Sequence, residues 1–391
     1  MTGPWPILAL CLVLRVGMGL QFQTVATVGP LLVESLAIDY ALLGTLIGAY
    51  LLPGVFVSLP GGWLMRRFGD RRIVLLGLAL MTAGGLLMAV AASWTPMLVG
   101  RLMSGSGGAL LNMVLVKIVA DRFSGRALVV AMGWLLTGWP LGIALSLVAL
   151  GTLGEAWGAP AVMIAGAGFC GSSLALFALL YREGREQETP AAGRATFRPG
   201  ELPPLLVSGI IWALFNACLV VVLGFAPAFL ATTGLSVAEA AAASSLVGWV
   251  IIPALPLGAW LAARIGRPNV TMLASFAGTA LLIALLAGNV APLASLVLLG
   301  AIFGPPGGLL MALPAQTLRP ENRAFGMGVF YTIYYVGMAS LPAVAGLARD
   351  LTGAPQAPLH AAAAMILAAA ALLPLFRVLE RRRQWRLALS P

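Results

Sequence analysis

The sequence predicts an all-α membrane protein with about twelve transmembrane helices in two pseudo-symmetric six-helix bundles. Of its 391 residues, 60% are hydrophobic and 9% are charged, whereas soluble domains carry about 25% charged residues. The apolar runs are continuous and about 20 residues long, which is the length of one helical crossing of a bilayer. Strands of a membrane barrel would alternate apolar and polar residues, so helices are expected to satisfy the backbone in lipid here.

The apolar runs are separated by charged residues or turn formers, which gives each helix an expected range. The ranges are 6–30, 41–63, 73–93, 97–118, 127–150, 159–181, 204–230, 238–261, 270–290, 292–315, 324–347 and 357–378. The first run lacks the basic region of a secretory signal, so we interpret it as a retained helix. In the tenth run, Gly304-Pro305-Pro306-Gly307 predicts an interruption, which fits either the edge of a transporter site or a hinge.

The basic residues predict the orientation of the chain. If both termini are cytoplasmic, the cytoplasmic segments hold all 23 Lys and Arg residues except Arg15, Arg101 and Arg349. This asymmetry follows the positive-inside rule and favours an even number of helices. The net charge of +10 is therefore interpreted as a topology signal, and nucleic acid is not expected as a partner. The expected location is a bacterial inner membrane, where the lipid bilayer surrounds the chain and a monomer suffices.

The two halves of the chain repeat at an offset of 197 residues. The segment GGWLMRRFGDRR from Gly61 corresponds to GAWLAARIGRPN from Gly258. The pair Arg126-Ala127 and Arg323-Ala324 has the same offset. Between the halves, residues 182–203 are polar and rich in charge, Pro and Gly, which is typical of a linker. We therefore expect bundles over residues 1–181 and 204–391. Parallel repeats favour a transporter with its binding site between the halves.

The loop after the second helix resembles the hallmark of the major facilitator superfamily, which runs approximately G-x-x-x-D-R-x-G-R-R. The matching residues are Gly62, Arg66, Arg67, Gly69, Asp70 and Arg71. The fourth helix is also similar to the superfamily pattern R-x-x-x-G-x-G-x-A, through Arg101, Gly105, Gly107 and Ala109. More narrowly, Val28-Gly29-Pro30-Leu31-Leu32, after an arginine in the first helix, resembles the cyanate and nitroimidazole porters. The resemblance implies a secondary transporter without a cofactor.

The hallmark loop departs from the family in its charges. Arg66 occupies the usual acidic position, and Asp70 follows the glycine at position 69. In the family the acidic residue helps to latch the cytoplasmic gate, and that role cannot pass to Arg66. The resemblance leaves a pairing of Arg67 with Asp121 as the candidate gate contact. Plain interface anchoring of the loop is the alternative.

Two arginines lie inside expected membrane helices, whereas all 13 Asp and Glu residues lie in loops or at helix ends. Arg15 is near mid-membrane in the first helix, and Arg101 is nearer the external side of the fourth. A charge at the bilayer centre costs at least about 2.5–3.5 kcal/mol, so it usually faces a water-filled cavity. The resemblance places both helices beside the central cavity. Both arginines are therefore candidate anion ligands, and the alternative is pairing with backbone carbonyls or neighbouring helices.

Other polar and aromatic residues fall at similar depth in their helices and are further candidates for substrate contact. They are Gln21, Gln23, Tyr50, Trp139, Asn216, Trp249, Tyr334 and Tyr335. Ligand sites commonly combine an apolar wall with a few polar groups, although ordinary helix packing explains each aromatic residue equally well.

These observations favour a secondary transporter of a small, anionic solute that works by alternating access. An exporter of apolar or cationic drugs is the alternative, favoured by the aromatic residues and disfavoured by the lack of an embedded acid. A membrane enzyme would need clustered His, Asp or Glu within helices, and a channel or receptor would not explain the repeat. No metal-ligand spacing or Walker pattern occurs, and Cys11, Cys170 and Cys218 lie in apolar runs as expected for small buried side chains. Exchange, facilitated diffusion and proton-coupled symport of the anion all stay open.

Overall fold

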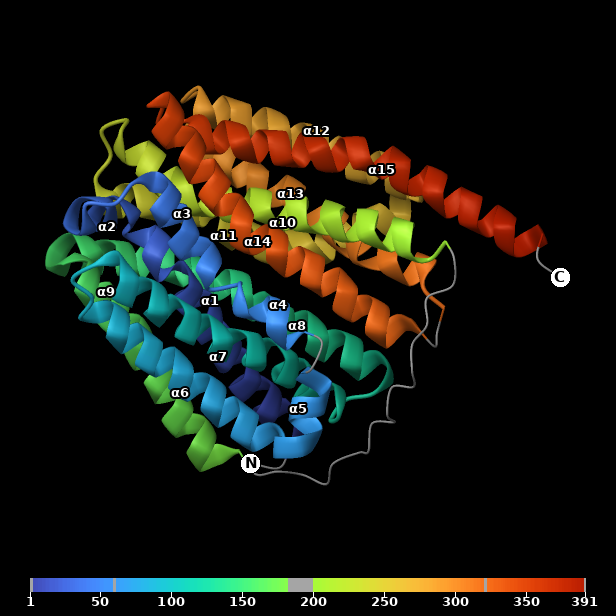
Figure 1. The fold of residues 1–391 in the computed structure, drawn as a ribbon, viewed down its shortest axis with the longest axis horizontal. Coiled ribbons are helices and arrows are strands. Elements are labelled where there is room, and N and C mark those ends of the chain that lie inside the picture. Colours follow the sequence, from blue (N-terminus) through green and yellow to red (C-terminus); the bar gives the residue numbers. More distant parts are fainter. Residues whose placement is uncertain (1–2, 59–60, 182–199, 320–321, 390–391) are drawn as a thin grey trace.

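The computed structural model describes residues 3–58, 61–181, 200–319 and 322–389, and this part of the chain contains helices and no strand (Figure 1). The first half contains α1 (Pro4–Thr27), α2 (Gly29–Leu36), α3 (Tyr40–Ala49), α4 (Pro53–Val57), α5 (Gly61–Phe68), α6 (Asp70–Ala89), α7 (Trp94–Ala120), α8 (Gly125–Leu145), the π-helical turn η1 (Ser146–Leu150) and α9 (Gly151–Leu180). The second half contains α10 (Leu202–Ala231), α11 (Val237–Ile265), α12 (Pro268–Ala287), α13 (Pro292–Thr317), α14 (Arg323–Thr352) and α15 (Ala357–Leu389).

Eleven segments of the described residues are long and apolar enough to cross a membrane. One of them, Val130–Leu180, has 51 residues, or about 77 Å at 1.5 Å per residue, which is enough for two crossings. It is broken at Gly158, where φ is 78° and ψ is 175°. Glycine adopts such a conformation far more readily than other residues. The all-α membrane fold is confirmed, and the twelve-helix layout is consistent with these segments.

The second and the fifth expected helices differ from the structure in where the helix breaks. The second expected helix, 41–63, is divided into α3 and α4. Around Pro53, which has no backbone N–H, the nitrogens of Leu51, Gly54 and Val55 donate to the carbonyl three residues earlier instead of four. The fifth, expected at 127–150, continues through η1 into the first residues of α9 and ends at Gly158. The chain has no strong helix breaker between Leu150 and Gly158, so its apolar sequence continues as helix.

The expected interruption at Gly304-Pro305-Pro306-Gly307 was wrong, since α13 is helical throughout Pro292–Thr317. The glycines serve close packing of α13 against α11 instead. A Cβ at Gly304 would overlap the carbonyl of Ala254, and a Cβ at Gly258 would lie 2.5 Å from the nitrogen of Pro305. Close contact with α11 supports the α13 backbone where the prolines remove hydrogen-bond donors.

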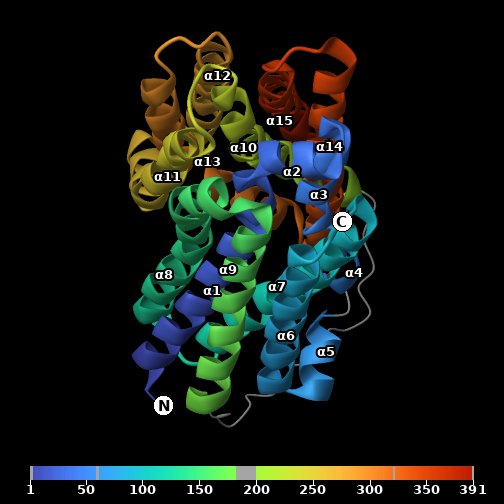
Figure 2. The same ribbon diagram turned by 90° about the vertical axis from the view of Figure 1, so that its left-hand side faces the viewer.

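The helices of each half pack mainly on one another, and the two halves meet along a few helices (Figure 2). In the first half, α6 packs on α7 and α9, and α1 packs on α8 and α9. In the second half, α10 packs on α14 and α15, and α13 packs on α11 and α12. We name these two sets the N-bundle and the C-bundle. They contact each other chiefly through α3 with α14 and through α11 with α8 and α9.

The bundles are held tightly together at the end opposite Tyr181 and Gly200, which flank the linker. We name this end, at α2 on the left of Figure 1, the closed end, and the other the linker end. Small residues bring the backbones of α3 and α14 together there. A Cβ at Gly44 would overlap the carbonyl of Pro342, and a Cβ at Gly48 would overlap that of Ala339.

Polar contacts reinforce the closed end. The Asp350 carboxylate accepts hydrogen bonds from the backbone nitrogens of Tyr40 at 3.0 Å and Ala41 at 2.7 Å. On the other side, the Glu155 carboxylate accepts from Ser236 Oγ and from the backbone nitrogen of Ala238, both at 2.9 Å. Each carboxylate therefore binds the beginning of a helix in the opposite bundle, where unpaired N–H groups favour an anion.

Candidate substrate site between the bundles

Arg15 lies on α1 at the interface between the bundles. Its side chain is 8% exposed, yet its Nε and Nη1 atoms are buried with no hydrogen-bond partner in the described part of the chain. Its electrostatic neighbours are the phenols of Tyr331, Tyr334 and Tyr335, on α14 of the C-bundle. Buried polar groups in proteins are normally hydrogen-bonded, so an unpaired guanidinium calls for a ligand or ordered water. Its donors are available to an anion.

The tyrosines of α14 form the opposite side of this site. The rings of Tyr334 and Tyr335 lie 5.0 Å apart, and those of Tyr331 and Tyr334 lie 6.1 Å apart. Tyr335 is linked to the N-bundle, because its hydroxyl accepts a hydrogen bond of 3.2 Å from Asn112 Nδ2 on α7. Tyr334 and Tyr335 were predicted from the sequence, whereas Tyr331 and Asn112 were not, because only the tertiary fold brings Asn112 of α7 to a tyrosine of α14.

Aromatic side chains form a cluster in each bundle. In the N-bundle, Phe22 lies 5.2 Å from Trp139 and 5.5 Å from Tyr50, between ring centroids. In the C-bundle, Trp212 of α10 lies 6.2 Å from Tyr334 and 6.4 Å from Phe330. Trp212 was not among the residues predicted from the sequence. The sequence does contain an indication of Trp212, because position 212 lies 197 residues after Arg15 and so corresponds to it in the repeat.

Arg101 has a different environment, inside the N-bundle. It is fully buried, and its guanidinium donates four hydrogen bonds to backbone carbonyls of α1 and α3. These are from Nε to Leu46 at 2.9 Å, from Nη1 to Gln21 at 3.1 Å, and from Nη2 to Phe22 at 3.0 Å and Ile47 at 3.4 Å. It also lies 5.0 Å from the ring centroid of Tyr50. Because its donors are occupied, its geometry suits the joining of α1, α3 and α7 better than ligand binding.

The two candidate glutamines also serve packing contacts. Gln21 is fully buried in the N-bundle, where Nε2 donates to Ser104 Oγ at 3.3 Å and to the carbonyl of Met81 at 3.4 Å. Gln23 crosses the interface, since its Nε2 donates to the carbonyl of Leu223 on α10 at 2.9 Å. Gln23 therefore joins the bundles on the closed-end side of Arg15.

The remaining predicted contacts differ in how close they come to Arg15. The hydroxyl of Tyr50 donates to the carbonyl of Met18 at 3.3 Å, within the N-bundle. Asn216 donates from Nδ2 to the carbonyl of Trp212 at 2.8 Å, so its amide lies along α10. The side chain of Trp249 is 39% exposed. Arg15 and the α14 tyrosines thus form the part of the predicted set that meets across the bundles.

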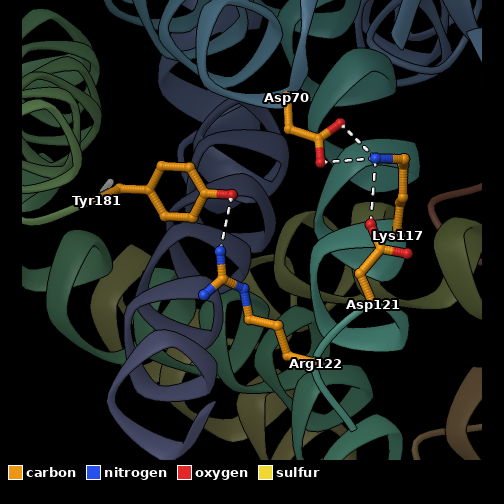
Figure 3. A network of polar contacts seen from close by, with 5 residues as sticks. All are labelled: Asp70, Lys117, Asp121, Arg122 and Tyr181. Carbon is orange, nitrogen blue, oxygen red and sulfur yellow. Dashed lines mark hydrogen bonds and ion pairs between the residues drawn. The ribbon is translucent and has the colours of Figure 1, made fainter. Parts of the chain in front are cut away.

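The predicted gate residues lie at the linker end, where Lys117 joins two acids (Figure 3). Lys117 Nζ lies 2.8 Å from Asp70 Oδ2 and 3.1 Å from Asp121 Oδ2. The suggested pairing of Arg67 with Asp121 is therefore not found, because Lys117, one helical turn earlier on α7, takes that carboxylate while Arg67 is exposed. Gly69, with φ of 77°, turns the chain into α6.

For two predicted gate residues, the structure gives the helix to which they belong and not their side-chain contacts. Gly62 and Arg66 belong to α5, and their side-chain surroundings lie outside the described residues. The ionic contact of Lys117 with Asp70 links α7 to α6, and its contact with Asp121 lies along α7, so both belong to the N-bundle. They stabilise one bundle rather than a contact between bundles.

On each side of the linker, a residue contacts an arginine, and the two arginines occupy corresponding positions of the repeat. Arg122 Nη2 donates to the hydroxyl of Tyr181 at 3.4 Å, and Arg319 Nε lies 3.0 Å from Glu201 Oε1. The positions 122 and 319 differ by the repeat offset of 197. Burial raises the pKa of the Tyr181 phenol above its ordinary value, so the Tyr181 hydroxyl that Arg122 contacts stays protonated at neutral pH.

Comparison with known proteins agrees with this architecture. The sequence model of the protein family described as the Major Facilitator Superfamily matches residues 11–342 and 221–391 of this chain. A 3-(3-hydroxy-phenyl)propionate transporter of Escherichia coli is 28% identical over 396 residues, covering 96% of this chain and 94% of that protein. Among solved structures, a D-xylose–proton symporter matches with a TM-score of 0.76 at 15% identity, covering 94% of this chain and 97% of the other. A bacterial homologue of the human lysosomal transporter Spinster matches with a TM-score of 0.73 at 16% identity, covering 96% and 95%.

The matches extend over both halves of the chain and agree with its all-helical membrane architecture. Proteins of this kind are transporters of small molecules and not enzymes. The chain belongs to the Major Facilitator Superfamily.

Proposed function

We propose that this chain is a secondary transporter of a small organic anion, and that Arg15 binds the anionic group of the substrate. The observation that carries the proposal is a buried guanidinium whose Nε and Nη1 have no partner in the described residues. Arginine presents several donors in a planar fork that matches the two oxygens of a carboxylate.

The surroundings of Arg15 favour an anion over a cation. Its electrostatic neighbours are three phenols rather than carboxylates. A cationic solute would meet an unneutralised positive charge in a low-dielectric site, where like charges repel strongly. An anion would instead supply the acceptors that the buried donors lack, so binding would offset the desolvation of both charges.

The position of Arg15 supports alternating access. Its helix belongs to the N-bundle and its neighbouring tyrosines to the C-bundle, so relative rotation of the bundles would change the site. Arg101 fastens α1 and α3 to α7, which lets the N-bundle move as one body. The small-residue contact of α3 with α14 would separate when the closed end opens.

A relative adds independent support for an organic anion. The protein of Escherichia coli that matches nearly the whole chain is named for transport of 3-(3-hydroxy-phenyl)propionate, an aromatic carboxylate. The aromatic rings of Tyr334 and Trp212 lie beside the candidate site and offer the type of surface that an aromatic ring prefers.

We further propose that the linker end faces the cytoplasm of a bacterial cell. Arg67, Arg71, Arg122, Arg267 and Arg319 all lie toward this end of their bundles, as the positive-inside rule requires. The structure then corresponds to a state closed toward the outside. Labelling single cysteines at Phe68 and Gly353 from either side of sealed membranes tests this orientation; labelling of Phe68→Cys from outside contradicts it.

The test of the main proposal is uptake of radiolabelled monocarboxylates into proteoliposomes that contain the purified chain. We expect saturable uptake by the wild type, competed by unlabelled carboxylates and not by organic cations. Arg15→Gln should lower uptake at least tenfold, since a charge-assisted hydrogen bond contributes about 1.5–3 kcal/mol. Arg267→Gln, the same change at an exposed arginine, should leave uptake unchanged.

Two results would contradict the proposal. Unchanged carboxylate uptake by Arg15→Gln would remove Arg15 from the site. Competition by hydrophobic cations with none by carboxylates would instead favour the drug-exporter alternative.

A further inference from the structure

A second buried donor without a partner lies across the interface from Arg15. It is the indole Nε1 of Trp212, on α10 of the C-bundle. Trp94 and Arg349 also have unpaired buried nitrogens in the described residues, but they lie near helix ends at the closed end. Arg15 and Trp212 are the pair that lies deep inside membrane helices.

The repeat relates these two positions. The difference between 15 and 212 is 197, the offset that also relates Gly61 to Gly258 and Arg126 to Arg323. The helices themselves agree, because α1 begins at Pro4 and α10 begins at Leu202. Each bundle therefore offers one unpaired donor from the corresponding place on its first helix.

Tyr334 connects the two donors in space. Its ring centroid lies 6.2 Å from that of Trp212, and its phenol is an electrostatic neighbour of the Arg15 guanidinium. The indole ring also stacks on Phe215 at 5.9 Å and on Phe330 at 6.4 Å. These contacts hold the plane of the ring, so the direction of its N–H is set by packing and not by a hydrogen bond.

We propose that Trp212 is the second hydrogen-bond donor of the substrate site, and that its N–H binds a neutral oxygen of the same anion whose carboxylate pairs with Arg15. This inference rests on the proposed function and narrows its substrate class. The substrate is an aromatic carboxylate that carries a hydroxyl or carbonyl oxygen away from the carboxylate.

The chemistry of the two donors orients such a substrate. A guanidinium is charged and selects the carboxylate, whereas an indole N–H is neutral and suits an uncharged acceptor. The rings of Trp212, Phe330 and Tyr334 supply an apolar wall between them. Because one donor belongs to each bundle, a substrate that reaches both would favour the bundle arrangement in which they face one site.

The test measures binding of benzoate, 3-hydroxybenzoate and 4-hydroxybenzoate to the purified full chain by calorimetry. We expect the wild type to bind one hydroxybenzoate about two- to tenfold more tightly than benzoate, as a net hydrogen bond of about 0.5–1.5 kcal/mol implies. Trp212→Phe should abolish this preference and leave benzoate affinity within about twofold. Arg15→Gln should weaken all three ligands.

Two controls distinguish loss of the Trp212 N–H from other effects of changing a tryptophan. Trp134→Phe makes the same change at an exposed tryptophan of α8 and should keep the preference. Replacing Trp212 by benzothienylalanine, which keeps the ring shape and lacks the N–H, should repeat the effect of Trp212→Phe, so that loss of the preference cannot be assigned to altered packing.

The outcomes separate this inference from the proposed function. If carboxylates bind and both Trp212 variants keep the wild-type preference, the role of Trp212 is overturned and the anion transporter stands. If the wild type binds none of the three carboxylates, the proposed function and this inference fall together.

Discussion

The two arginines inside the membrane have the same side chain and opposite surroundings. Arg101 is fully buried in the N-bundle, where four carbonyls of α1 and α3 accept its hydrogen bonds. Arg15 is almost as buried, at 8% exposure, but two of its nitrogens have no partner in the described chain. Satisfied donors stabilise a fold, whereas unsatisfied donors raise its free energy until a ligand supplies acceptors.

The surroundings of Arg101 belong to one bundle, whereas those of Arg15 belong to both. The hydrogen-bond and aromatic partners of Arg101 in the described chain all belong to the N-bundle, so its contacts can persist through a transport cycle. Around Arg15, the neighbours include tyrosines of the other bundle, so its contacts change when the bundles move. In this chain, the lack of partners for two Arg15 nitrogens distinguishes the candidate ligand-binding arginine from Arg101.

The largest effect is expected from Arg101→Gln. This change removes the charge and most of the four hydrogen bonds, and we expect a loss of about 3 kcal/mol or more of stability. The measurement is the melting temperature and yield of the monodisperse protein in detergent. Arg101→Lys should recover part of the loss, because it keeps the charge without the planar fork. A variant that melts like the wild type would show that the hydrogen bonds of Arg101 do not stabilise the N-bundle.

The next effect is expected at the closed end of the interface. Gly44→Leu would force a side chain into the backbone of α14 at Pro342, at a cost of about 1–3 kcal/mol to this state. In an Ala345→Cys background, where position 345 is fully buried, maleimide labelling should become about tenfold faster for each 1.4 kcal/mol. Gly133→Leu is the matched control, since nothing lies within 4 Å of a Cβ there. Equal labelling in both would contradict the closed-end contact.

Arg15→Met should change stability in the opposite direction to Arg101→Gln. Replacing an unpaired buried charge by an apolar side chain of similar length should raise stability by about 1–3 kcal/mol in ligand-free protein. Thermal unfolding without ligand measures this directly. Added carboxylate should stabilise the wild type and leave the variant unchanged. A lower melting temperature for Arg15→Met would mean that its guanidinium is satisfied in the free protein.

The smallest effect is expected from Asp121→Asn at the linker end. Asp121 pairs with Lys117 one helical turn away, its side chain is 30% exposed, and such pairs contribute about 0.3–0.5 kcal/mol. Asp70→Asn should cost more, because Asp70 is 9% exposed and contacts Lys117 through both oxygens. Paired chemical denaturation curves test this order. A reversed order would show that the pair of Lys117 with Asp121 along α7 stabilises the protein more than the contact of Lys117 with Asp70 of α6.

Much of the architecture was predictable from the sequence because lipid imposes strong rules on a chain. Continuous apolar runs had to become helices, and the repeat at 197 residues identified two halves. The helix boundaries were predicted less accurately where the chain bends without a polar segment. Gly158 reverses the chain inside an apolar run, and Pro305 and Pro306 were expected to interrupt a helix that the packing of α11 keeps intact.

By itself, the sequence determined that two arginines enter the membrane without acidic companions. It could not distinguish them, because the partners of Arg101 are carbonyls of α1 and α3, whose approach to α7 no local pattern encodes. Only the tertiary structure decided that Arg101 is enclosed within one bundle, whereas Arg15 and Trp212 both neighbour Tyr334 with buried donors that have no partner in the described chain. The physical reason is that hydrogen-bond satisfaction depends on which atoms lie within about 3 Å, and in this fold those atoms come from distant segments of the chain.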